Sequence, residues 1–223
     1  MTALRTVAIG PSRVRVAKIL CVAKNYEDHA REMNSRLPDA PIFFLKPRTS
    51  LLSDGGTVLL PPESTRVEVE TELAAILGRG GCDVERDDAM DLVAGYAVFF
   101  DITGRDLQAQ ARKDGSPWTA AKGFDTFATV SDAVAASKVR DPHALPIRLR
   151  VNGVIRQDST TSKMVFGIPS LIAAASRIAT LERGDIPATG TPAGVWPIAV
   201  GDMLDAEIPG VGRLPCDVAA RNR

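Results

Sequence analysis

Two glutamates, Glu70 and Glu72, stand two positions apart in a segment whose composition is typical of a β-strand. Side chains two apart on a strand point to the same face of the sheet, so these two carboxylates are expected to converge. Glu68 continues the same alternation toward solvent, and a solvated strand face explains the spacing as well as a bound cation does. The spacing alone therefore leaves both interpretations open.

Asp101 supplies a third carboxylate. It follows the apolar run 97–100, which is expected to be buried, and an isolated buried carboxylate is costly unless it is paired or bound to a metal. The alternatives are that Asp101 caps the following helix or pairs with Arg105. Three carboxylates without a histidine or a thiolate favour a hard cation, Mg²⁺, Mn²⁺ or Ca²⁺, over zinc.

Lys122 and His143 are further isolated polar residues. Lys122 lies between Trp118 and Phe124 in a stretch with few other charges, and a lysine buried there would need an anion nearby. The alternative is a lysine at the surface. His143 lies in an expected loop, and we predict that it is a surface residue without a functional role.

The elements that must position these side chains are mostly strands. We predict strands in apolar or alternating runs at residues 16–23, 41–47, 58–60, 67–77, 96–100, 185–189, 203–208 and 213–218. A hairpin is expected at 149–156, because Asn152-Gly153 supplies the two positive φ angles that a type I′ turn requires. Residues 54–56 are expected to form a turn.

Few helices are expected. Residues 25–33 are compatible with a short polar helix, and residues 87–93 predict a second short one that ends before Gly95. Apolar residues at helical spacing between Pro169 and Gly184 predict an amphipathic helix, the longest in the protein. Without a β-α-β alternation, a GxGxxG motif or a Walker loop, the pattern favours a strand-rich α+β fold over a doubly wound nucleotide-binding fold.

Length and composition indicate one globular domain. The 223 residues are 45% hydrophobic and 24% charged, which is ordinary for a soluble protein. We predict a single catalytic domain over 1–223, with an N-terminal extension at about 1–15. Residues 25–40 are predicted to form a mobile lid, because they are polar, offer few side chains to anchor them and end in a link bounded by prolines.

Charge and cysteine usage exclude several kinds of partner. Lys and Arg total 27 and Asp and Glu total 27, so no basic field attracts nucleic acid or an anionic membrane. The three cysteines lie far apart and favour neither a disulfide framework nor a zinc site. The sequence shows no export signal and no apolar run of about 20 residues, which predicts a cytoplasmic protein without a membrane partner.

Several separated motifs, in order from about residue 19 to residue 218, resemble those of the fumarylacetoacetate hydrolase family. The matching segments are Cys21 to His29, P-x-x-F-x-K-P at 41–47, E-x-E-L-A at 70–74, residues 101–108, W-x-x-A-K-G-F-D at 118–125, Val151 to Gly153 and Thr189 to Pro192. Any one of these is weak, but their shared order is hard to match by chance. The resemblance implies a strand-rich, mixed β-sandwich or roll of the fumarylacetoacetate hydrolase type.

The resemblance also implies roles for individual residues. Glu70, Glu72 and Asp101 would be the ligands of one divalent cation, Mg²⁺ or Mn²⁺. His29 and Glu32 would form a catalytic pair on the lid. The residues implied to contact a small 2-oxo acid substrate are Lys24, Arg105, Gln108, Lys122 and Thr191, of which Lys122 would also take part in catalysis.

The subgroup implied by the resemblance is that of short acylpyruvases and oxaloacetate decarboxylases, which suggests a homodimer and a place in aromatic catabolism. We predict a metal-dependent hydrolase that cleaves a C–C bond in acylpyruvates such as fumarylpyruvate or acetylpyruvate. Water activated by His29 would attack the C4 carbonyl, and the departing group is the enolate of pyruvate. Loss of carbon dioxide from oxaloacetate gives the same enolate, so decarboxylation is also expected.

Two alternatives stay open. An isomerase or tautomerase would use the same enolate without cleaving a bond, and a non-catalytic protein would hold a structural Ca²⁺ with the three carboxylates. Three departures from the family pattern are expected to matter: the first would alter the surroundings of the metal, and the other two would reshape the substrate pocket and put the exact substrate in doubt. Glu68-Val69 stands where the family often has a histidine, Trp196 stands where relatives commonly place a glycine, and Pro187 lies within an expected strand.

Overall fold

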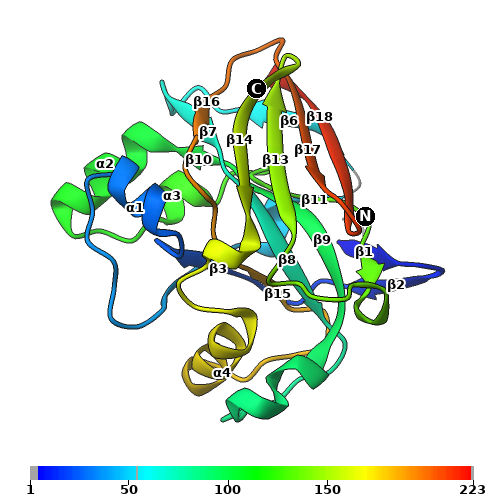
Figure 1. Ribbon diagram of the computed structural model, residues 1–223. Coiled ribbons are helices and arrows are strands. Elements are labelled where there is room, and N and C mark those ends of the chain that lie inside the picture. Colours follow the sequence, from blue (N-terminus) through cyan, green and yellow to red (C-terminus); the bar gives the residue numbers. More distant parts are fainter. Residues whose placement is uncertain (1–4, 54, 222–223) are drawn as a thin grey trace.

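Within the described residues, 5–53 and 55–221, the strands of this computed structural model form four sheets (Figure 1). The largest sheet has eight strands. Its main path runs β4 (Ile42–Lys46), β3 (Ile19–Ala23), β15 (Ile186–Ala188), β8 (Thr71–Leu77), β9 (Val93–Asp101), β11 (Ala128–Val130) and β5 (Leu51–Ser53), and β12 (Val134–Ala135) pairs with β9.

Three smaller sheets complete the strand framework. A five-stranded sheet has the order β14 (Val154–Thr160), β13 (Pro146–Val151), β17 (Met203–Ile208), β18 (Gly212–Ala220) and β6 (Gly56–Leu60). A three-stranded sheet has the order β10 (Thr103–Gly104), β7 (Val67–Val69) and β16 (Trp196–Pro197). The last sheet is the hairpin of β1 (Thr6–Ile9) and β2 (Ser12–Arg15).

The helices are short, as predicted. The α-helices are α1 (Glu27–Glu32), α2 (Arg105–Asp114), α3 (Thr119–Lys122) and α4 (Ile168–Ile178), and the 3₁₀ helices are η1 (Arg48–Ser50), η2 (Arg86–Leu92), η3 (Ala136–Lys138) and η4 (Thr161–Lys163). In Figure 1, α1, α2 and α3 gather on one side of the sheets, and α4 lies apart from them at the lower end. No helix of the described residues is long and apolar enough to cross a membrane. The strand-rich fold with few helices confirms the predicted fold class.

The central strand β8 is buried on both faces. Leu73, Ala75 and Leu77 belong to the core between the two large sheets, whereas Ala74 and Ile76 belong to a second apolar cluster on the other face. A strand covered on both faces has a continuous apolar sequence, which is the pattern that β8 shows. Side chains at the start of this strand therefore lie inside the protein.

The predicted strand 67–77 is interrupted at Glu70. Residues before the break form β7, which leaves the large sheet to pair with β10 and β16, and residues after it form β8. The backbone N–H of Asp101 donates to the carbonyl of Glu70 at 2.9 Å across the break. The break therefore lies beside the end of β9, where Asp101 is located.

Several local predictions are confirmed and others need correction. The 149–156 hairpin is present, with φ of 52° at Asn152 and 78° at Gly153. Within the predicted N-terminal extension, residues 6–15 form a hairpin whose Val7 and Val14 are buried, so these residues are part of the domain. Residues 1–4 of that extension, and Asp54 of the predicted turn, lie outside the described residues.

The helix α2 is not predicted by the residue pattern. Its sequence is mostly polar, and only Arg105 and Gln108 are buried, so it lacks the apolar stripe that marks an amphipathic helix. It ends at Gly115, whose φ of +66° suits the left-handed residue that often follows a helix. This helix nevertheless carries two side chains into the site described next.

Candidate active site

The three predicted carboxylates come together at the junction of β7, β8 and β9. Glu70 lies at the strand break, Glu72 is the second residue of β8, and Asp101 is the last residue of β9. One ligand atom from each lies within 4.8 Å of the other two, and the residues are 5%, 1% and 1% exposed. The antiparallel pairing of β8 with β9 therefore brings three buried carboxylates to one place, as strand alternation predicts.

Two buried lysines face this cluster. Lys122 at the end of α3 lies 3.0 Å from Glu70 and 2.6 Å from Asp101. Although burial lowers it, the charges of Asp101 and Glu70 raise the pKa of Lys122 overall, so its ammonium group stays protonated. Lys46 at the end of β4 lies 2.7 Å from Oδ1 of Asp101. The prediction that a buried Lys122 would meet an anion is confirmed.

Oδ1 of Asp101 lies beside the Lys46 ammonium but accepts no hydrogen bond. Lys46 directs its hydrogen bonds to the carbonyl oxygens of Ile102, Lys122 and Phe127, at 2.8 to 2.9 Å. The close contact with Lys46 is therefore electrostatic, and the buried Oδ1 is left without a hydrogen-bond partner. A carboxylate oxygen in this state is suited to coordinate a cation.

Glu72 has the weakest compensation of the three carboxylates. Its Oε2 accepts a hydrogen bond from the backbone N–H of Gly190 at 2.8 Å. Burial, followed by the neighbouring charges of Asp101 and Glu70, raises the pKa of Glu72 well above its ordinary value. The cluster thus has one more buried carboxylate than its lysines neutralise, and an oxygen-preferring divalent cation fits this donor set.

Arg105, the first residue of α2, connects the cluster to a further buried glutamate. Its guanidinium lies 2.5 Å from Glu68, donates to Glu70, and lies 2.6 Å from Oε1 of Gln108. Glu68 is only 4% exposed, so the predicted continuation of the alternation toward solvent is wrong. The two alternatives for Asp101, a helix cap or a pair with Arg105, are also wrong, because Asp101 pairs with two lysines.

His29 and Glu32 form a pair on α1. Nδ1 of His29 lies 3.0 Å from Oε2 of Glu32, whose carboxylate also accepts from the backbone N–H of Gly194. Burial raises the pKa of Glu32, but the hydrogen bonds from His29 and Gly194 outweigh this effect and lower it. Glu32 thus holds the imidazole in place through Nδ1 and leaves Nε2 as the free ring nitrogen.

The start of the predicted lid is well anchored, which corrects the expectation of few anchoring side chains. Tyr26 is fully buried, and Asn25 is 1% exposed. The Asn25 amide donates to the carbonyls of Phe166 and Thr189 and accepts from the N–H of Phe166. The mobility of the segment stays a prediction, and it concerns the exposed residues beyond α1 more than the residues before it.

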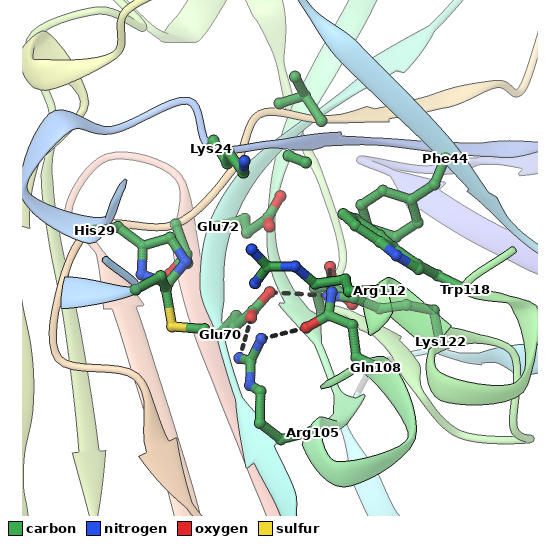
Figure 2. A pocket seen from close by; sticks show the side chains of 15 residues that line it. Lys24, His29, Phe44, Glu70, Glu72, Arg105, Gln108, Arg112, Trp118 and Lys122 are labelled. Carbon is green, nitrogen blue, oxygen red and sulfur yellow. Dashed lines mark hydrogen bonds and ion pairs between the residues drawn. The ribbon is translucent and has the colours of Figure 1, made fainter. Parts of the chain in front are cut away.

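These side chains surround one cavity (Figure 2). Figure 2 shows His29 on one side of Glu70 and Glu72, and Lys122 on the other. Phe44 and Trp118 form an edge-to-face pair with centroids 5.5 Å apart, and the Lys122 ammonium lies 4.9 Å from the Phe44 ring centroid. The cavity is lined by Val22, Ala23, Lys24, His29, Met33, Phe44, Glu70, Glu72, Asp101, Arg105, Gln108, Arg112, Trp118, Lys122 and Thr191.

Comparison with known proteins decides the family. Residues 18–219 match the fumarylacetoacetate hydrolase C-terminal family. This chain belongs to the fumarylacetoacetate hydrolase family. The match spans nearly all of the chain and confirms the resemblance seen in its motifs.

Three relatives of the fumarylacetoacetate hydrolase family illustrate the range of reactions. The mitochondrial oxaloacetate tautomerase of Arabidopsis thaliana is 44% identical over 204 residues, which cover 92% of each chain. The fumarylpyruvate hydrolase of Pseudomonas aeruginosa, solved with Mn²⁺ and pyruvate, is 34% identical with a TM-score of 0.91, covering 97% of this chain and 96% of that one. A 5-carboxymethyl-2-hydroxymuconate delta-isomerase from Mycobacterium smegmatis is 37% identical with a TM-score of 0.83, covering 94% and 81%.

Lys24 and Thr191, which the family resemblance assigns to the substrate, both line the cavity but differ in their hydrogen bonds to the protein. Lys24 lines it and has a φ of +58°, a strained backbone angle of the kind that is often found at functional sites. Thr191 also lines it, but its hydroxyl donates to the carbonyl of Thr71 and accepts from Gln157, both at 2.8 Å. The side chain of Thr191 is therefore committed to the protein.

The departures from the family pattern lie outside the cavity lining. The Trp196 ring stacks on the guanidinium of Arg156 at 3.5 Å, and Pro187 lies within β15. Neither residue lines the cavity, so the expectation that they reshape it is not supported by direct contact. His143 is also corrected, because its Nε2 accepts from the backbone N–H of Ile168 at the start of α4, which is a structural role.

The sequence did not reveal two charged residues, Lys46 behind the carboxylate cluster and Arg112 in the cavity lining. Lys46 belongs to the P-x-x-F-x-K-P motif, and its place between two prolines gave no sign that it meets Asp101. Arg112 lies on α2, which was not predicted, seven residues after Arg105 and four after Gln108. Spacings of three, four and seven along a helix would have placed these side chains on one face, had the helix been recognised.

Proposed function

We propose that this chain is a divalent-cation-dependent enzyme that interconverts the keto and enol forms of a small 2-oxo acid, with oxaloacetate as the principal substrate. The observation that carries this proposal is the cavity in which three buried carboxylates lie beside Lys122 and face His29. Support also comes from the tautomerase of Arabidopsis thaliana, which aligns with 92% of this chain. An enolate is common to this reaction and to those named for the other relatives.

The proposed ligands of the cation are Glu70, Glu72 and Asp101. Their all-oxygen donor set suits Mg²⁺ or Mn²⁺, which prefer carboxylate oxygens and keep open positions for a substrate. A bound cation of this kind would act as a Lewis acid that favours negative charge on the oxygen of an enolate. The unpartnered Oδ1 of Asp101 and the poorly compensated Glu72 are the features of the chain that fit such an ion.

Lys122 is proposed to stabilise the oxygen on C2. Its ammonium is buried and protonated, and a preorganised charge in a dry site stabilises developing negative charge more strongly than water does. The Phe44 ring 4.9 Å away helps to exclude water from this side of the cavity. Arg105 and Gln108, joined to each other at 2.6 Å, are proposed to orient the C1 carboxylate.

His29 is proposed to move the proton at C3. In the keto-to-enol direction, the free ring nitrogen accepts a proton from C3, and the electrons of that C–H bond leave an enolate. The imidazolium then gives this proton, through a water, to the C2 oxygen and becomes neutral again, and the reverse direction runs the same steps backward. Glu32 fixes the ring through Nδ1, 3.0 Å away, and stabilises the imidazolium that forms. No bond between carbon atoms is broken in this reaction, and the C2–C3 bond becomes double in the enol.

Hydrolysis of acylpyruvates is the second candidate, favoured by the same His29–Glu32 contact. A base held by a carboxylate can activate a water for attack at C4, and the Pseudomonas aeruginosa relative is a fumarylpyruvate hydrolase. Oxaloacetate decarboxylation needs the enolate-stabilising side of the cavity but no activated water.

Three broader expectations remain predictions: a homodimer, a cytoplasmic location and a role in aromatic catabolism.

The test measures the rate at which the enol absorbance of oxaloacetate decays. The rate is measured first with protein freed of metal by a chelator and then after addition of Mg²⁺ or Mn²⁺. The proposal predicts an acceleration that requires both protein and cation. Lys122→Met should remove most of it and weaken oxalate binding by about 1.5–3 kcal/mol, the value of a charged hydrogen bond. Lys163→Met, at an exposed lysine, is the control. A rate equal to that of the free cation would exclude the proposal and favour a structural Ca²⁺ protein.

A further inference from the structure

The cationic side chains of the cavity differ in whether they already have an anionic partner. Lys122 contacts Glu70 and Asp101, and Arg105 contacts Glu68 and Glu70, so each already has two anionic partners in the protein. Among the residues that the structure describes, Lys24 and Arg112 also line the cavity and make no ion pair or side-chain hydrogen bond. These two cations are available to a ligand.

Arg112 is placed to reach the ligand. It lies on the same face of α2 as Arg105 and Gln108, because residues seven and four apart fall in line on a helix. In Figure 2 its side chain extends from α2 toward the middle of the pocket. It also lines a neighbouring hollow formed with Met33 and it is exposed, so Arg112 lies at the mouth of the cavity.

The charge balance of the cavity favours a ligand with more than one negative charge. Four lining side chains are cationic, Lys24, Arg105, Arg112 and Lys122, and three are anionic, which leaves one positive charge. A divalent cation raises this to three. A monocarboxylate offsets one of these charges and a dicarboxylate two, and the second carboxylate of a dicarboxylate would be attracted to the exposed Arg112 at the edge of the cavity.

We propose that Arg112 is a specificity-determining residue that binds the distal carboxylate of the substrate and so selects dicarboxylic over monocarboxylic 2-oxo acids. This inference rests on the proposed function, since it assumes that the C1 end of the acid lies at the carboxylate cluster. A guanidinium suits the role because its planar donors bind a carboxylate through two parallel hydrogen bonds. Lys24, the other unpartnered cation, assists as a point charge.

The experiment compares two unreactive ligands of equal chain length that differ only at the distal end. Malate has a distal carboxylate, and 2-hydroxybutyrate has a methyl group in its place. Calorimetric titration of the Mn²⁺-loaded protein should show malate binding about 10- to 100-fold more tightly, as expected for one charged, bidentate contact. Arg112→Gln should reduce that ratio to near one, and Arg112→Lys should restore part of it.

Two controls separate this role from a general electrostatic one. Lys113→Gln removes the same charge from the next position of the last turn of α2, at an exposed residue outside the cavity lining, and should keep the malate preference. Oxalate has the chelating end alone, so its affinity should stay within about twofold in Arg112→Gln. Equal weakening of oxalate and malate in Arg112→Gln, or equal effects of the two variants, would overturn the inference.

The outcomes also distinguish this inference from the proposed function. If the wild-type protein binds Mn²⁺ and oxalate but shows no preference for malate, the inference alone fails. If it binds neither, the proposed function fails and takes the inference with it. A preserved malate preference in Arg112→Gln would likewise overturn the assignment to Arg112.

Discussion

The ammonium nitrogen of Lys46 lies 2.7 Å from Oδ1 of Asp101, and both side chains are almost completely buried. The same nitrogen donates to three backbone carbonyls, those of Ile102, Lys122 and Phe127. Lys46 ends β4 and Asp101 ends β9, so one lysine ties two strands of the large sheet to the end of α3. This contact makes Lys46 a structural support of the carboxylate cluster.

Lys46→Met is expected to destabilise the protein by about 3–5 kcal/mol, because it leaves Asp101 without one of its buried cations and three carbonyls without a donor. Lys163→Met removes an exposed lysine that lies 3.4 Å from Asp28, and should change stability by less than about 1 kcal/mol. Urea denaturation of both variants at pH 7 measures the difference. A Lys46→Met protein as stable as the control would contradict this role.

The lowered pKa of Asp106, in the first turn of α2, leads us to expect that the stability of the protein depends on pH. Its carboxylate accepts from the hydroxyls of Ser64 and Thr65 at 2.6 and 2.8 Å and from two backbone N–H groups. Burial raises its pKa, but these hydrogen bonds outweigh that effect and lower it from 3.8 to about 2. A lowered pKa stabilises the folded state above the ordinary pKa, and the stabilisation is lost as the pH falls toward 2.

Asp106→Asn is therefore expected to be less stable than the wild type at pH 7, by about 1 kcal/mol. The difference in unfolding free energy between the two proteins should be constant above about pH 5. It should narrow between about pH 4 and pH 2, where the wild-type carboxylate becomes protonated. Urea denaturation at a series of pH values measures it. A gap that stays the same down to pH 2.5 would mean that the Asp106 charge contributes nothing to α2.

His29→Ala separates the reactions that need a base from the one that does not. Tautomerisation and acylpyruvate hydrolysis should fall by about 10²–10⁴, the usual contribution of a general base. Oxaloacetate decarboxylation should persist, because it uses Lys122 and the carboxylate cluster. Glu27→Gln, which removes an exposed carboxylate from the same helix, is the matched control for changes in α1. Equal losses in all three reactions would show that His29 serves each of them.

The carboxylate cluster was predictable because its geometry is local. Glu70 and Glu72 are only two positions apart, so they stay close together although the predicted strand breaks at Glu70, and Asp101 follows from an apolar run that ends in a charge. Lys46 was not, because its contact with Asp101 joins residues 55 apart and depends on which strands pair. Glu68 was misplaced for a similar reason: its burial comes from Arg105, on a helix that carries no apolar stripe.

The fold class was predictable for a related reason. Period-two alternation, continuous apolar runs and the Asn152-Gly153 turn are signals that short segments carry by themselves. The order of strands in the sheets is set by contacts between distant segments, such as the parallel pairing of β15 with β3. The break at Glu70 also depends on such contacts, since β7 leaves the large sheet to pair with β10 and β16.

We propose that Glu70, Glu72 and Asp101 hold one divalent cation, and the variant Glu72→Gln can disprove this claim. Gln keeps the size of Glu72 and the acceptor for the Gly190 N–H, and it removes a charge that is poorly compensated without a cation. Calorimetric titration with Mn²⁺ should show one site in the wild type and none in Glu72→Gln, whose unfolding free energy without metal is at least that of the wild type. Equal Mn²⁺ affinity in the two proteins would contradict the claim.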